Sequence, residues 1–147
     1  MIRDTRRSFE LEPFLQKPLF AHLSTQSMEG PRHSPVWFLW EEGSLWIIGT
    51  SADTFPDRIR SQPSCALGIV DYDPGSGLVL HAGFRGRAEV LPYDRERGRR
   101  LLARYLGPDQ ELWDPRFRGF GDGSVLIRFT PDTVVVRDQS YEVRSRE

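Results

Sequence analysis

The most informative segment of the chain reads Arg32-His33-Ser34-Pro35-Val36-Trp37-Phe38-Leu39-Trp40. Side chains alternate between the two faces of a strand, which would place His33, Pro35, Trp37 and Leu39 on one face and Ser34, Val36, Phe38 and Trp40 on the other. Beyond Ser34 both faces are largely apolar, whereas a strand with one face in water alternates between apolar and polar residues. We therefore expect one face to fill a core and the other to meet a partner chain, a cofactor or a covering helix.

Further strands are expected on both sides of this segment. Apolar runs bounded by turn residues predict strands at residues 19–25, 32–40, 45–50, 65–71 and 78–91, and a final hairpin of residues 125–130 and 133–137 around Pro131-Asp132. Gly83 and Gly86 are expected to bend the longest strand, as glycines do in small barrels. Apolar spacing and stop signals predict helices at residues 51–61 and 93–106, and a short amphipathic stretch at 9–16.

This arrangement indicates the fold class. Six or seven strands joined mainly by short turns, with few helices, are typical of an antiparallel barrel rather than of alternating strand and helix units. The length of 147 residues fits one domain. We expect this single domain to span residues 1–147, with its core at about residues 14–137 and a polar tail at 138–147.

Composition excludes several classes of protein. The formal net charge is −1, from 20 basic and 21 acidic residues, so we expect no general affinity for nucleic acids or anionic membranes. Cys65 is the only cysteine, which rules out an intramolecular disulfide and a cysteine-based zinc site. No apolar run approaches the roughly 20 residues of a membrane span. The charged residues 1–7 lead into no long apolar core, so we expect no signal peptide and a cytoplasmic location.

Several segments, in their order and spacing, resemble the pyridoxamine 5′-phosphate oxidase-like FMN-binding split-barrel proteins. The resemblance covers about residues 14–107 and rests on residues 19–25, 32–38, 45–50, 58–63 and 86–90, which read LFAHLST, RHSPVWF, LWIIGT, RIRSQP and GRAEV. It implies a six-stranded antiparallel split β-barrel, a homodimer, and FMN bound at the subunit interface. Some relatives use the deazaflavin F420 or bind haem, so the resemblance leaves these cofactors as alternatives.

The resemblance also implies where a flavin would lie. The strand beside the isoalloxazine ring would be the one that contains Ser34, Pro35, Val36 and Trp37, with backbone groups of Ser34 and Val36 at the polar edge of the ring. The ribityl phosphate would lie near Thr50, Ser51 and Arg58. In such dimers a C-terminal segment can reach the flavin of the partner subunit. Here Trp113 or Arg116 would do so, unless this segment is a loop tucked onto its own barrel.

The chain departs from the family pattern at the phosphate. Many members carry a phosphate-binding lysine eight residues before the proline that matches Pro63. That position is Phe55 here, and the basic residue two places further on is replaced by Asp57. Arg58 or Arg60 could supply the missing positive charge.

The residue pair Thr50-Ser51 precedes a predicted helix start. Unpaired backbone N–H groups at such a position can hold a phosphate, with hydroxyl groups as further donors. The alternative is a capped helix with nothing bound. Asp53 lies close by in the sequence and would repel a phosphate unless its side chain points away.

Two functions remain open from the sequence. The first is an FMN-binding oxidoreductase that transfers hydride to or from a small molecule, with the flavin supplying the redox chemistry; no residue stands out as a catalytic acid or base. The second is the same fold without a bound flavin, as a ligand-binding or interaction protein. The spacing of the three histidines predicts no metal site. The aromatic residues that can either stack on the ring or fill a core and a dimer interface are Trp37, Phe38, Trp40 and Trp46.

Overall fold

The computed structural model describes residues 9–144, so the charged residues 1–7 and the last three residues of the predicted tail lie outside it. The described part is mainly β, with three α-helices and two short 3₁₀ helices. The strands are β1 (Ala21–Ser27), β2 (Gly30–Val36), β3 (Leu39–Glu41), β4 (Ser44–Gly49), β5 (Ser64–Asp73), β6 (Leu78–Pro92) and β7 (Val125–Asp138). The helices are α1 (Leu11–Leu15), α2 (Phe55–Ser61), α3 (Arg95–Leu106), η1 (Gln110–Leu112) and η2 (Pro115–Phe117).

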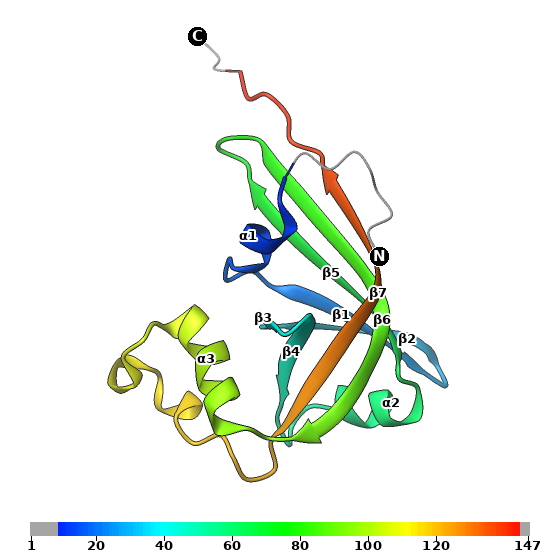
Figure 1. Cartoon of the computed structure of the whole chain (residues 1–147), viewed down its shortest axis with the longest axis vertical. Helices are drawn as coiled ribbons and strands as arrows, with labels where there is room; N and C mark the ends of the chain where they lie inside the picture. Colours follow the sequence, from blue (N-terminus) through cyan, green and yellow to red (C-terminus); the bar gives the residue numbers. More distant parts are fainter. Residues whose placement is uncertain (1–8, 145–147) are drawn as a thin grey trace.

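The strands form one antiparallel sheet of seven, in the order β2-β1-β5-β6-β7-β4-β3. The sheet curls without closing, and β2 and β3 are its two edges (Figure 1). The expectation of a mainly β protein built on an antiparallel sheet is confirmed, whereas the sheet has seven strands where the resemblance implied six.

One additional strand arises from residues 32–40, which we expected to form a single strand. The segment divides into β2 and β3 because Trp37 and Phe38 leave the ladder. The Phe38 N–H instead donates a hydrogen bond to the Tyr105 hydroxyl on α3, with 3.0 Å between nitrogen and oxygen. The chain thereby leaves one edge of the sheet and joins the opposite edge.

The predicted hairpin near the C-terminus is wrong. Residues 125–138 form the single strand β7, which pairs with β6 along its length. Arg85 pairs with Thr133 whereas Gly86 pairs with Pro131, so the register shifts at this point in a β-bulge. Proline is tolerated at bulges, and Pro131-Asp132 therefore bends the strand rather than reversing it.

Two hydrophobic clusters lie on the two sides of the sheet. The first fills the inside of the curl and includes Leu23, Phe38, Ile47, Phe84 and Phe129, together with Phe14 from α1 and Phe55 and Ile59 from α2. The second joins α3 to the outside of β3 and β4, and its buried members are Leu39, Trp46, Leu101, Leu102, Trp113 and Leu126. Phe38 and Leu39 belong to different clusters, which explains why both faces of residues 32–40 are apolar.

Both longer helices begin later than predicted. Helix α3 begins at Arg95 because the carboxylate of Asp94 accepts hydrogen bonds from the backbone N–H groups of Glu96 and Arg97, at 3.0 and 3.2 Å. Helix α2 begins only at Phe55, with Pro56 in its first turn. Residues 51–53, expected to begin this helix, lie in a turn and its continuation instead.

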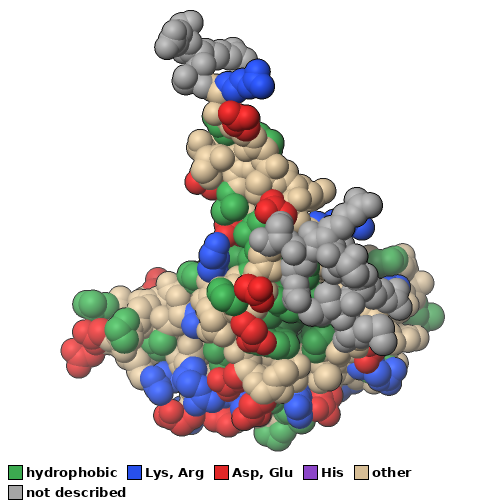
Figure 2. Space-filling view, turned by 45° about the horizontal axis from the view of Figure 1, so that its top comes forward, with side chains coloured by type: hydrophobic (Ala, Val, Ile, Leu, Met, Phe, Trp, Pro, Cys, Tyr) green, Lys and Arg blue, Asp and Glu red, His purple; other side chains and the backbone are tan. Residues whose placement is uncertain are grey.

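The surface carries mixed charge, and acidic and basic side chains lie next to one another on the face shown in Figure 2. Among the residues that the structure describes, no helix is both long enough and apolar enough to cross a membrane. The residues of the tail from 138 to 144 are exposed. The tail is held where it passes Gly77, whose carbonyl accepts a hydrogen bond from the Tyr141 N–H at 2.9 Å.

Candidate functional site

A cavity of about 430 Å³ opens between β2, the end of β4 and helix α3. Small-molecule sites in proteins have volumes of roughly 300 to 1,000 Å³ and are mostly lined by apolar side chains. Apolar residues of this lining from β4, α2 and α3 are Ile48, Phe55, Leu101 and Leu102. The cavity is therefore large enough and apolar enough for a small planar ligand.

Strand β2 meets the cavity with its edge. The five consecutive residues from His33 to Trp37 all line the cavity, whereas a strand face would contribute only every second residue. In the described sheet β2 pairs with β1 alone. Alternate residues of β2 therefore direct their backbone N–H and C=O groups away from the sheet. Such groups can hydrogen-bond to the polar rim of a planar ligand.

Stacked aromatic rings form a second wall. The ring of Trp37 is stacked with that of Tyr105 at 4.5 Å between centroids and with that of Phe117 at 5.4 Å. The Tyr105 hydroxyl donates a hydrogen bond to the Leu19 carbonyl at 2.7 Å. Burial raises the pKa of this hydroxyl above its ordinary value, so it keeps its proton at neutral pH. Trp37 is thus positioned before any ligand arrives.

The turn after β4 closes one end of the cavity, where both Thr50 and Asp53 line it. One carboxylate oxygen of Asp53, Oδ2, accepts hydrogen bonds from the Thr50 backbone N–H at 2.8 Å and from the Thr50 hydroxyl at 3.0 Å. The backbone donor and the hydroxyl that a phosphate would need at Thr50 are therefore bound by a side chain of the same turn.

The predicted phosphate residues beyond Thr50 do not line the cavity. Arg58 donates to the Thr25 hydroxyl and to the Thr54 hydroxyl, each at 2.7 Å. Arg60 forms an exposed ion pair with Asp57 at 2.9 Å. Ser51 is exposed in the turn.

The segment after α3 packs on its own chain through Trp113. Trp113 is 4 % exposed within the second cluster, and its indole N–H donates to the Gly107 carbonyl at 2.8 Å. The Arg116 guanidinium lies over the Phe117 ring, 4.7 Å from its centroid. Two other residues of this segment, Phe117 and Phe120, line the cavity, whereas Trp113 and Arg116 do not.

The aromatic residues that were expected either to stack on a ring or to fill a core and an interface have different surroundings. Phe38 and Trp46 are buried in the first and second clusters. The indole N–H of Trp40 donates to the Glu12 carboxylate at 2.8 Å. Trp37 is the member of this group that lines the cavity.

Histidine and cysteine side chains were the other candidates for chemistry in the part of the chain that the structure describes. His33 lines the cavity, and its Nε2 lies 2.9 Å from Nδ1 of the exposed His22. Burial raises the pKa of the Cys65 thiol to about 11, so the thiol is protonated at neutral pH. Within the described residues, no group of three or more histidine, cysteine, aspartate or glutamate side chains is placed to hold a metal ion.

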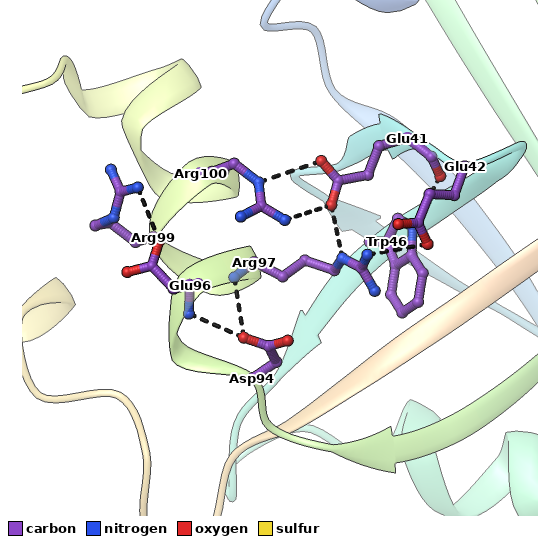
Figure 3. A network of polar contacts seen from close by, with 8 residues as sticks. All are labelled: Glu41, Glu42, Trp46, Asp94, Glu96, Arg97, Arg99 and Arg100. Carbon is purple, nitrogen blue, oxygen red and sulfur yellow. Dashed lines mark hydrogen bonds and ion pairs between the residues drawn. The ribbon is translucent and has the colours of Figure 1, made fainter.

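An ion-pair cluster fixes the α3 wall of the cavity to the β3–β4 hairpin. Arg97 Nε and Arg100 Nη2 bind the same oxygen of Glu41 at 2.6 and 2.7 Å (Figure 3). Arg97 also lies over the Trp46 ring, 3.6 Å from its centroid, and reaches Glu42 at 3.1 Å. The hydrogen bond from Arg100 lowers the pKa of the Glu41 carboxyl most strongly, partial burial raises it, the bond from Arg97 lowers it again, and the net shift is downward.

We expect Glu41→Gln to lower the free energy of unfolding by about 1–2 kcal/mol at pH 7, because the three charged hydrogen bonds that Glu41 accepts from Arg97 and Arg100 are weakened. Since the pKa of Glu41 is lower in the folded protein, its contribution is complete above about pH 4.3, the ordinary value for glutamate. The contribution disappears as the pH falls further through the folded pKa. Urea unfolding of both proteins between pH 3 and pH 7 measures this, and the two curves should converge at the acid end.

Glu42→Gln is the matched control. Glu42 contacts the same Arg97, but 67 % of its side chain is exposed, and exposed ion pairs contribute roughly 0–1 kcal/mol. If the two variants lost the same stability at pH 7, the role assigned to Glu41 would be wrong.

Sequence reasoning found one wall of the cavity and missed the other. Of the residues for which the resemblance implied contact with a flavin, Ser34, Pro35, Val36, Trp37 and Thr50 line the cavity. The lining residues that were not predicted include Phe20, Ile48, Leu101, Leu102, Phe117 and Phe120. Apolar spacing predicted a helix at residues 93–106, but no sequence signal indicated which part of the sheet it covers.

Several solved structures are similar to this chain over most of its length. No protein-family model and no curated protein matches the chain. A conserved hypothetical protein, Rv2991 from Mycobacterium tuberculosis, is similar with a TM-score of 0.78 and 18 % identity, over 100 % of this chain and 97 % of that one. An F420 reductase is similar with a TM-score of 0.61 and 24 % identity, over 87 % and 98 %. A putative pyridoxamine 5′-phosphate oxidase from Listeria innocua is similar with a TM-score of 0.65 and 15 % identity, over 89 % and 96 %.

The chain has the pyridoxamine 5′-phosphate oxidase-like split-barrel fold. Among the solved structures with this fold are also an FAD-binding protein from Mesorhizobium loti and a haem storage protein from Vibrio cholerae. The resemblance seen in the sequence is therefore confirmed at the level of the fold. At identities of 13–24 % these structures show the shared fold, while the ligand of this chain depends on its own cavity.

Proposed function

We propose that the cavity binds the isoalloxazine ring of a flavin, FMN in the first instance, and that the protein is a flavin-dependent oxidoreductase acting on a small molecule. The observation that carries this proposal is the cavity beside the free edge of β2, which is lined by aromatic rings and lies in a split-barrel fold. Proteins of this fold are described as binding FAD, F420 or haem.

The residues at the ring end of the cavity fit such a cofactor. Backbone groups on the free edge of β2 would bind the polar rim of the ring. These are the N–H and C=O of His33 and the C=O of Pro35, because Ser34 and Val36 alternate with them and face β1. Trp37, held by Tyr105, would border it, and Phe117 and Phe120 would exclude water. When bound, the flavin supplies hydride-transfer chemistry that the side chains of this protein do not possess.

We further propose that two copies of the chain associate, with the cavity at their interface. Phe20 supports this, because its large apolar side chain lines the cavity and yet is 53 % exposed in a single chain. A second copy covering Phe20 would remove it from water and close the cavity. Sedimentation velocity at micromolar concentration tests this association, and a monomer at all concentrations would contradict it.

A second candidate function is a binding protein for a flat, uncharged ligand other than a flavin. The observation in its favour is that no lysine or arginine lines the cavity among the described residues, and that Phe55 occupies the position of the phosphate-binding lysine. F420 and haem also carry anionic groups, so the lack of a lysine or arginine in the described lining argues against these two cofactors as it does against FMN.

Flavin titration tests the proposal. We expect purified protein to bind FMN saturably, followed as quenching of flavin fluorescence, and to lose at least tenfold in affinity on Val36→Trp, because the indole would fill the cavity beside the ring. Val70→Trp is the control, since Val70 is 44 % exposed and does not line the cavity. Circular dichroism verifies that both variants fold. F420 is titrated in parallel, and a protein that binds neither cofactor contradicts the proposal.

A further inference from the structure

The cavity has two chemically different ends. At one end lie the edge of β2 and the rings of Trp37 and Phe117, which suit a planar ring. At the other end lie Thr50 and Asp53, where the resemblance implied the phosphate of FMN. The ring end fits a flavin, and the phosphate end does not.

The donors at Thr50 are occupied. Its backbone N–H and its hydroxyl both donate to Oδ2 of Asp53, at 2.8 and 3.0 Å. A phosphate could accept hydrogen bonds from these two donors only by displacing the Asp53 carboxylate, which is itself an anion and already occupies the position of the phosphate oxygens. Because like charges repel at short distance, the phosphate would also have to overcome the charge of Asp53 if the carboxylate stayed nearby.

No positive charge compensates for Asp53. Among the described residues that line the cavity, Asp53 is the one acidic group and no lysine or arginine is present. The two arginines of α2 that were expected to bind a phosphate have other partners. Arg58 is bonded to Thr25 and Thr54, and Arg60 to Asp57. Phe55, at the position of the usual lysine, is 4 % exposed in the first hydrophobic cluster.

We infer that Asp53 determines specificity at this end of the cavity by selecting a ligand whose tail is uncharged. This inference rests on the proposed function, because it concerns the tail of the proposed flavin. It means that FMN binds through its ring alone and that riboflavin, which lacks the phosphate, binds at least as tightly. Asp53 acts on the ligand by filling the anion position and by its charge.

Titration of the wild-type protein and of two Asp53 variants with riboflavin and with FMN tests this inference. In the wild type we expect FMN to bind no more tightly than riboflavin. Asp53→Ala frees the two Thr50 donors, and Asp53→Asn removes the charge while keeping an acceptor oxygen. Both variants should strengthen FMN binding by about threefold to tenfold, the range expected when one partly exposed charge is removed, and should change riboflavin binding less than twofold.

Asp57→Asn is the matched control, because it removes the same charge from the same segment but from a carboxylate that pairs with Arg60 and does not line the cavity. It should leave the ratio of the two affinities unchanged. The inference is overturned if wild-type protein binds FMN tenfold more tightly than riboflavin, or if the Asp53 variants leave the ratio unchanged.

A separate pair of probes distinguishes failure of this inference from failure of the proposed function. If neither flavin binds to any variant, the proposed function fails. The neutral 1-naphthol and the anionic 1-naphthyl phosphate then replace the flavins as probes of the cavity. Tighter binding of 1-naphthol, with a gain for the phosphate in Asp53→Asn, supports the selection by Asp53. Equal binding of both probes, or of neither, overturns it.

Discussion

Gly86→Ala is expected to lower the free energy of unfolding by about 3 kcal/mol, the upper part of the range for overpacked interiors. A Cβ atom at Gly86 would lie 2.2 Å from the Thr130 carbonyl oxygen and 2.8 Å from Cα of Pro131. Both atoms belong to the backbone of β7, so they cannot move aside as the end of a flexible side chain can. The added methyl group would have to separate β6 from β7 at the bulge, and β7 also carries β4.

Gly83→Ala is the control for this prediction. Gly83 lies three residues earlier in the same strand, and a Cβ atom there would meet only the His81 ring, at 3.5 Å. Its unfolding free energy should therefore stay within about 0.5 kcal/mol of wild type. Urea denaturation at one fixed protein concentration measures both variants, because any self-association would make stability depend on concentration. A loss below 1 kcal/mol for Gly86→Ala would show that the strands separate easily at the bulge.

The bend at Gly86 illustrates what the sequence can and cannot predict. Glycine inside a long apolar strand predicted a bend or bulge there, and the register shift between Arg85 and Gly86 agrees with it. The partner of the bulge was predicted wrongly, because Pro131-Asp132 has the composition of a turn. Local composition cannot tell a proline in a bulge from a proline in a turn. That difference depends on whether β6 is long enough to pair with both halves of β7.

In the candidate site, too, the residues of one sequence segment were predicted, whereas residues brought in by the packing of distant segments were not. Residues 34–37 were predicted to lie beside a ligand because the unusual apolar pattern and the resemblance to known proteins both occur within this one segment. His33, which also lines the cavity, was not predicted. Leu101, Phe117 and Phe120 were missed because they reach the cavity only through the packing of α3, which Glu41 and Arg97 hold in place. Asp53 was recognised as a residue that would oppose a phosphate unless it pointed away. The structure shows that its carboxylate points toward Thr50 and accepts hydrogen bonds from the Thr50 N–H and hydroxyl, the donors that a phosphate would need.

Phe55→Lys, which introduces the residue expected here from the resemblance to the FMN-binding split-barrel proteins, should destabilise this protein by about 3–5 kcal/mol. The Phe55 side chain is 4 % exposed and belongs to the first hydrophobic cluster with Ile59. Truncation of a buried phenylalanine to alanine costs about 3–5 kcal/mol. A lysine loses less volume, but its ammonium group would also have to be removed from water. The lysine of the family therefore cannot be restored at this position by a single substitution.

Phe55→Leu keeps the site apolar and should cost only about 1–1.5 kcal/mol. Comparing the two variants by urea denaturation thus separates the cost of burying a charge from the cost of lost volume. The effect on binding is measured by titrating Phe55→Lys with FMN at a temperature where the variant remains folded. We expect its affinity for FMN to be no higher than that of the wild type. The contrary result, a stability loss near that of Phe55→Leu together with tighter FMN binding, would mean that a lysine at this position of the cavity lining can hold its charge beside the phosphate. In that case the loss of the phosphate site would follow from this one residue, and Asp53 would have no part in it.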